Sequence, residues 1–78
     1  MGKLEKILEK FRNYPPEGRF TDVQWLLEQY GFTQVRSKGS HHHFRNAQGQ
    51  IVSVPKIKGK MVKLTYIKII LSLIDLEA

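Results

Sequence analysis

The chain has 78 residues and no cysteine, so the sequence predicts one small domain that depends on a hydrophobic core, without disulfides or thiolate metal sites. Thirteen Lys and Arg residues against seven Asp and Glu give a net charge of +6, which favours an anionic partner. No apolar run is long enough to span a bilayer and no signal peptide is recognisable, so we expect a cytoplasmic protein that does not bind membranes.

The positive charge is concentrated in the second half of the chain. Residues 33–74 contain Lys and Arg but no Asp or Glu. Scattered basic residues usually form only a solvated surface, but a segment this long without a carboxylate indicates a surface that binds an anionic polymer such as RNA.

The first predicted element is a helix over residues 3–13, because apolar side chains recur at i, i+3, i+4 and i+7. Two prolines and a glycine in residues 14–18 then predict a turn or short linker. A second helix is predicted from Thr21, which has the spacing of a capping box with Gln24. Gly31 suits the left-handed position that ends a helix.

Three short strands are predicted over residues 33–37, 42–46 and 51–54, with turns at residues 38–40 and 48–49. A basic loop follows over residues 56–60, and a last helix begins near Thr65. This order predicts an α+β fold in which helices cover one face of a three-stranded antiparallel meander. It matches the α-β-β-β-α arrangement of a double-stranded-RNA-binding domain (dsRBD), so residues 1–78 form a single domain with a dsRBD-like core at 20–76 and an added N-terminal helix.

The last helix is apolar on more than one face, from Tyr66 to Leu76. Core packing explains one of these faces. The surplus predicts a surface for a partner protein or for a second copy of the chain in a homodimer.

A run of three histidines follows the Lys38-Gly39-Ser40 turn, and it lies mid-chain, unlike an expression tag. An imidazole both takes and gives a proton near neutral pH. Strand alternation places His41 and His43 on one face and His42 on the other, so the three do not converge on one metal ion. We expect no metal site and no cofactor, and structural roles for His42 and His43.

Several short motifs resemble, in order and spacing, the HicA toxins, which are small RNA-cleaving proteins of bacterial and archaeal toxin–antitoxin systems. The resemblance runs from about residue 20 to residue 75. It rests on Tyr30-Gly31-Phe32, Lys38-Gly39-Ser40-His41, Phe44, Gly49, Val52-Ser53-Val54-Pro55, Gly59 and residues 62–67.

The resemblance implies a dsRBD-like fold, cleavage of mRNA without a cofactor, and neutralisation by a HicB antitoxin in a type II system. By motif, the functional histidine of the family falls on His41. Many members have a second histidine soon after the strand-ending proline, where this chain has Ile57. The role of that second histidine is either missing in this chain or filled by another residue.

Metal-independent RNA cleavage uses the 2′-hydroxyl of the substrate as nucleophile, so we expect His41 to act as the general base. The backbone amides of the Gly39-Ser40 turn are candidates for holding the phosphate. The side chains expected to bind RNA are those of Arg36, Lys38, Ser40, Lys56, Lys58 and Lys60.

Two alternatives remain at this stage. One is a non-catalytic RNA-binding module of the same fold, which the basic surface supports equally well. The other is a protein-interaction adaptor that uses the apolar last helix, which the excess positive charge argues against.

Overall fold

The computed structural model describes residues 2–77, with side chains described as far as Ile74. The elements run in the order α1 (Lys3–Arg12), β1 (Glu17–Arg19), α2 (Phe20–Gln29), β2 (Thr33–Lys38), β3 (His41–Arg45), β4 (Ile51–Pro55), β5 (Met61–Lys63) and α3 (Leu64–Glu77). The expected α+β class and the three-stranded meander are confirmed, with boundaries that differ by a residue or two.

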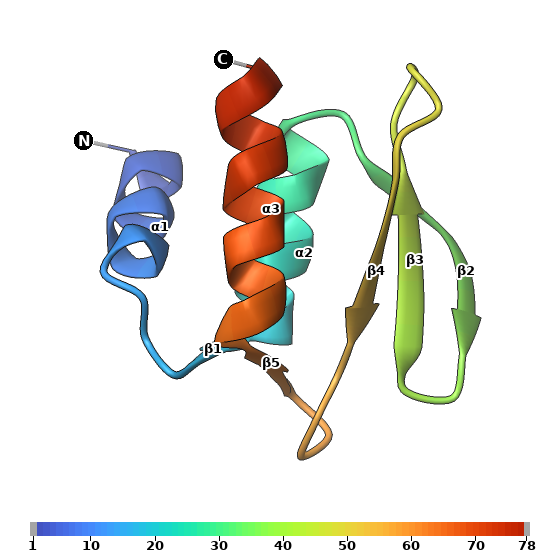
Figure 1. Ribbon diagram of the computed structural model, residues 1–78, viewed down its shortest axis with the longest axis horizontal. Coiled ribbons are helices and arrows are strands. Elements are labelled where there is room, and N and C mark those ends of the chain that lie inside the picture. The colour runs from blue at the N-terminus through green and yellow to red at the C-terminus, as the bar shows by residue number, and fades with distance from the viewer. Residues whose placement is uncertain (1, 78) are drawn as a thin grey trace.

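The three-stranded sheet has the order β2-β3-β4 and is antiparallel throughout. Figure 1 shows α2 and α3 stacked against one face of this sheet, with α1 on the far side of the two helices. Within the described part of the chain, no element covers the opposite face. We call this opposite face of β2-β3-β4 the open face.

The core lies between the helices and the sheet, and alternation along the strands decides which residues enter it. Phe44 of β3 and Val52 and Val54 of β4 are buried, whereas their neighbours in the chain lie on the open face. They pack with apolar side chains of the three helices, chiefly Phe11, Val23, Leu26, Leu27, Ile67, Ile70 and Ile74. Phe32 is also fully buried.

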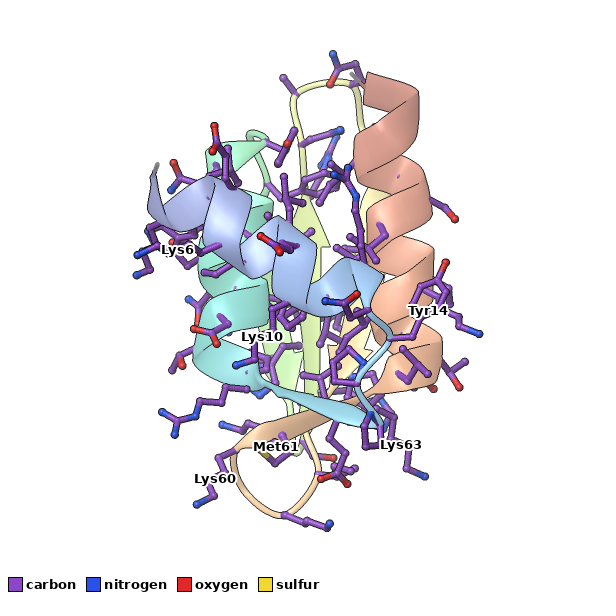
Figure 2. All side chains as sticks on the ribbon, turned by 90° about the vertical axis from the view of Figure 1, so that its left-hand side faces the viewer. Lys6, Lys10, Tyr14, Lys60, Met61 and Lys63 are labelled. Carbon is purple, nitrogen blue, oxygen red and sulfur yellow. The ribbon has the colours of Figure 1, made fainter. Side chains whose placement is uncertain are left out.

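A second sheet was not predicted from the sequence. The sequence predicts a turn over residues 14–18 and a loop over residues 56–60, but in the structure Glu17–Arg19 pairs antiparallel with Met61–Lys63. Figure 2 shows this pair beneath α1, with Lys60 and Met61 at the lower end of the molecule. Three-residue strands carry too little hydrophobic periodicity to be recognised in a single sequence.

The predicted capping box at the start of α2 is wrong. The helix begins at Phe20, directly after β1, and its N-cap residue Arg19 makes no side-chain capping hydrogen bond. The Phe20 N–H instead donates to the Lys60 carbonyl at 2.8 Å. The pairing of β1 with the chain before β5 therefore supplies a backbone acceptor where a side-chain cap was expected.

The predicted end of α2 is confirmed. Gly31 has a φ of +87°, and the Phe32 N–H donates to the Leu27 carbonyl at 3.0 Å, as in a Schellman motif. This turn directs the chain out of the helix layer and into β2 (Figure 1).

The pairing of β2 with β3 contains a β-bulge at Val35. Gln34 pairs with Phe44, but the next pair is Arg36 with His43, followed by Ser37 with His42 and Lys38 with His41. Without the extra residue, regular pairing would place Arg36 opposite His42, on the face covered by helices. The bulge therefore brings Arg36 and Lys38 to the open face.

No helix of the described residues is both long enough and apolar enough to cross a membrane.

Gly18 packs where no side chain fits, and this gives a test of the unpredicted sheet. A Cβ added there would lie 2.8 Å from Phe11 Cε1 and 2.9 Å from Ile67 Cδ1. We expect Gly18→Ala to lower the unfolding free energy by about 1–3 kcal/mol, because overpacking forces these buried side chains apart. Urea unfolding measures this. Gly2→Ala is the control, since nothing lies within 4 Å of its Cβ; equal stability of both variants would contradict the packing of β1 on the core.

Candidate active site

The three histidines lie at the start of β3 and divide between the two faces of the sheet, as strand alternation predicted. His41 pairs with Lys38 and Pro55, His42 with Ser37 and Val54, and His43 with Arg36 and Ser53. Since Val54 is buried in the core, His42 faces the helices, whereas His41 and His43 share the open face.

His41 is exposed and follows a two-residue turn. Gly39 has a φ of +58° and is the first of the two central residues, which suits a type II′ hairpin turn. The Ser40 carbonyl accepts a hydrogen bond from the Lys56 N–H at 2.8 Å, so the chain leaving β4 is tied to this turn. His41 therefore lies at a fixed corner of the sheet, beside the exposed side chain of Lys38.

His43 is half-buried on the same face as His41. Its Nδ1 lies 2.7 Å from the Ser53 hydroxyl oxygen, within hydrogen-bond distance. Val35, Arg36, His43 and Ile51 surround a shallow hollow of about 220 Å³ beside it. Val35 and Ile51 are 56% and 62% exposed, so the hollow combines apolar walls with one cation and one imidazole.

His42 lies between the sheet and α2, with its ring centroid 4.6 Å from that of Phe20. Both ring nitrogens are buried without a hydrogen-bond partner among the described residues. Burial, followed by the positive charges of Lys56, His41 and His43, lowers the pKa of His42 from its ordinary value of 6.5. A half-buried, neutral imidazole whose nitrogens are buried and whose ring packs on Phe20 fits the structural role expected for His42.

The basic residues expected to bind RNA do not all lie on one surface. Arg36, Lys38 and the Gly39-Ser40 turn accompany His41 on or beside the open face. Lys56 instead extends over the Phe20 ring, with its Nζ 5.0 Å from the centroid, on the side of the sheet that faces the helices. Lys58 forms an ion pair with Glu17, with its Nζ 3.0 Å from Oε2.

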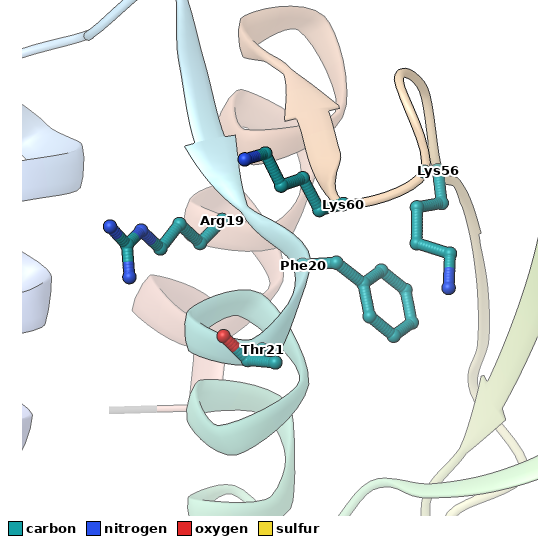
Figure 3. A pocket seen from close by; sticks show the side chains of 6 residues that line it. Arg19, Phe20, Thr21, Lys56 and Lys60 are labelled. Carbon is teal, nitrogen blue, oxygen red and sulfur yellow. The ribbon is translucent and has the colours of Figure 1, made fainter.

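Lys56 and Lys60 line a second cavity, of about 330 Å³, between the basic loop and the start of α2. Arg19, Phe20, Thr21 and Gly59 complete its lining. In Figure 3, Phe20 and Lys56 lie together on one side of the chain, whereas Arg19 and Lys60 extend to the other side. Arg19 was not predicted as part of a basic surface, because β1, the short strand that positions it, was not predicted from the sequence.

Ile57 occupies the position at which the resemblance implies a second histidine, and its backbone closes a turn. Its N–H and carbonyl both bond to Met61, at 2.7 and 2.8 Å, which closes the turn between β4 and β5. In the described part of the chain, no three His, Asp or Glu side chains are arranged to hold a metal ion.

The chain matches a known protein family. A family model described as the HicA toxin of bacterial toxin–antitoxin systems matches residues 20–76. That range begins at the first residue of α2 and includes the whole three-stranded sheet. No curated protein and no solved structure matches this chain.

Neutral His42, whose ring nitrogens are buried, predicts acid sensitivity. Because its folded-state pKa lies below 6.5, the unfolded chain binds more protons than the folded chain as the pH falls below that value. The stability that neutral His42 contributes is therefore present above pH 6.5 and is lost as the pH falls through the lowered pKa. We expect His42→Phe, which keeps the ring contact with Phe20, to lose less unfolding free energy between pH 7 and pH 5 than the parent. Urea titrations at several pH values measure this, and parallel losses in both proteins would contradict the assignment.

Proposed function

This chain belongs to the HicA toxin family, and on that premise we propose that it cleaves mRNA at the open face of its sheet, with His41 as the general base. The family assigns the chain to the toxins of bacterial toxin–antitoxin systems. The single observation that supports the site is the placement of an exposed imidazole at a fixed corner of an uncovered sheet face, with Lys38 opposite.

The proposed reaction needs no metal ion. Neutral His41 accepts the proton of a ribose 2′-hydroxyl, and the resulting oxygen nucleophile attacks the adjacent phosphorus. The negative charge that develops on the phosphate is stabilised by cations already in position, which costs no reorganisation during the reaction. Lys38, across the hairpin from His41, is the nearest such cation in the strand register.

The Gly39-Ser40 turn supports phosphate binding in a second way. Gly39 lacks a side chain, so the backbone of the turn approaches a phosphate closely, and the Ser40 hydroxyl is exposed beside it. Arg36 extends the positive surface along β2 toward His43. Together these groups form a basic track along the edge strand.

The loop lysines are proposed to hold RNA farther from the scissile phosphate. Lys56 and Lys60 border the cavity next to Arg19, at the same end of the sheet as the Gly39-Ser40 turn (Figures 1 and 3). Lys58 stays in the proposed set, but its contact with RNA competes with the ion pair to Glu17. Such contacts read the shape and backbone of RNA and carry little sequence information.

A HicB-type antitoxin is the proposed partner of this toxin. The side chains of α3 leave an apolar stripe partly uncovered, with Ile69 46% exposed and Tyr66 and Leu73 half-buried. An antitoxin or a second copy of the chain would bury this stripe. Light scattering of the parent and of Ile69→Lys tests whether a second copy covers the stripe. A parent dimer that dissociates in the variant identifies the stripe as a homodimer surface.

An RNA cleavage assay in the presence of EDTA tests the proposed activity. We expect the parent protein to cleave mRNA and His41→Ala to lose about 10²- to 10⁴-fold in rate, because a positioned general base contributes about that much. RNA binding should persist in the variant. Binding by both proteins without cleavage by either would identify the alternative, a non-catalytic RNA-binding module.

The salt dependence of RNA binding tests the basic track. We expect Arg36→Gln and Lys38→Gln each to weaken binding and to reduce the slope of log K against log salt by about one, since each removes one phosphate contact. Lys6→Gln is the matched control for net charge, because Lys6 lies on α1, separated from the sheet by the other helices (Figures 1 and 2). Equal effects of all three substitutions would show that RNA binding depends only on the total charge of the protein and not on the basic track.

A further inference from the structure

We propose that His43 is the general acid of the reaction and protonates the leaving 5′-oxygen, while the Ser53 hydroxyl orients its ring. This inference rests on the proposed ribonuclease activity and adds a second catalytic residue to it. The sequence alone favoured a structural role for His43. Its position on the open face, together with its bond to Ser53, points to this different role.

The spacing of the two histidines suits one phosphodiester group. Residues two apart on a strand lie about 7 Å apart and point to the same face. Each imidazole reaches an oxygen about 3 Å away through a hydrogen bond. His41 and His43 can therefore each form a hydrogen bond to one of two oxygens on opposite sides of a single phosphorus. One of these oxygens loses a proton and the other gains one.

Ser53 gives the His43 ring a defined orientation. The 2.7 Å contact joins Nδ1 to the Ser53 hydroxyl, so Nε2 is left for the substrate. When the imidazole is protonated, Nδ1–H donates to the Ser53 oxygen, which remains an acceptor. His41 and His42 have no such side-chain hydrogen bond among those described, so His43 is the imidazole of the run with a side-chain partner to orient it.

The groups around His43 complete a site for an anion. Arg36 faces His43 from β2. Ser53 and Ile51 face it from β4, and neither of them is charged. On its own strand, His41 and Arg45 share the face. The bulge at Val35 is what brings Arg36 to this position. The positive charges of Arg36 and Arg45 favour the binding of a phosphate beside His43.

The other groups on this face do not replace His43 as a proton donor. An arginine guanidinium does not give up its proton in proteins, which excludes Arg36 and Arg45. His42 is on the opposite face and its nitrogens are buried. An imidazole, in contrast, both releases and regains a proton near neutral pH.

The step balances without a co-reactant. The 2′-oxygen gives its proton to His41 and forms a bond to phosphorus, and the bond from phosphorus to the 5′-oxygen breaks. The 5′-oxygen takes the proton from His43 Nε2. The products are a 2′,3′-cyclic phosphate and a 5′-hydroxyl, and the two histidines end with their protonation states exchanged.

A substrate with a better leaving group tests this role. Once the parent's cleavage site in an RNA is mapped, the bridging 5′-oxygen at that site is replaced by sulfur, which leaves as a thiolate without protonation. We expect His43→Gln to slow cleavage of ordinary RNA by about 10²-fold or more, yet to cleave the 5′-thio RNA within about threefold of the parent rate. We expect His41→Ala to be slow on both substrates.

Two further variants sharpen the test. Ser53→Ala should reduce the rate of cleavage of ordinary RNA, but by less than His43→Gln does. On the 5′-thio RNA, Ser53→Ala should cleave at close to the parent rate. If Ser53 only supported the fold, the variant would stay slow on both substrates. Lys6→Gln controls for surface charge, and thermal unfolding confirms that each variant is folded.

The outcomes separate this inference from the proposed function. If His43→Gln is equally slow on both substrates, or as fast as the parent on ordinary RNA, His43 is not the general acid while the role of His41 stands. If the parent cleaves neither substrate, or His41→Ala cleaves as the parent does, the proposed function itself is wrong.

Discussion

The backbone pairing of β2 with β3 decides which side chains meet on the open face of the sheet. A one-residue change in register moves every side chain of a strand to the other face. The bulge at Val35 makes such a change within β2, so that Arg36 and Lys38 lie beside His43 and His41. The proposed base, the proposed acid and their two cations thus depend on one irregular residue and one two-residue turn.

The opposite face of the same strand explains why only part of the histidine run is available for chemistry. His42 enters the space between sheet and helices, where Phe20 covers its ring and burial keeps it neutral. Phe44 follows it into the core. One set of alternate residues of the strand therefore packs the sheet against α2, and the other set lies on the open face, where RNA is proposed to bind. Lys56, which bonds to the turn through its backbone and lies over Phe20, connects the two regions.

The meander and the division of the histidines between two faces could be predicted because the valines of β4 and the turn glycines have strong, regular patterns. The bulge could not, since β2 is exposed along its whole length and no hydrophobic alternation marks its register. The β1–β5 pair was missed because each strand has only three residues. The contact of Ser53 with His43 could have been predicted from the sequence, because strand alternation beside Val52 and Val54 places Ser53 on the open face.

The most direct test of the account is an NMR titration of the isotopically labelled protein with an RNA whose 2′-hydroxyls are methylated, so that it binds without being cleaved. We expect the largest shift changes at Arg36, Lys38, His41 and His43, including the imidazole signals of the two histidines, and little change at the His42 ring. Changes centred instead on Arg19, Lys60 and the start of α2, with the open face unaffected, would contradict the assignment of the active site.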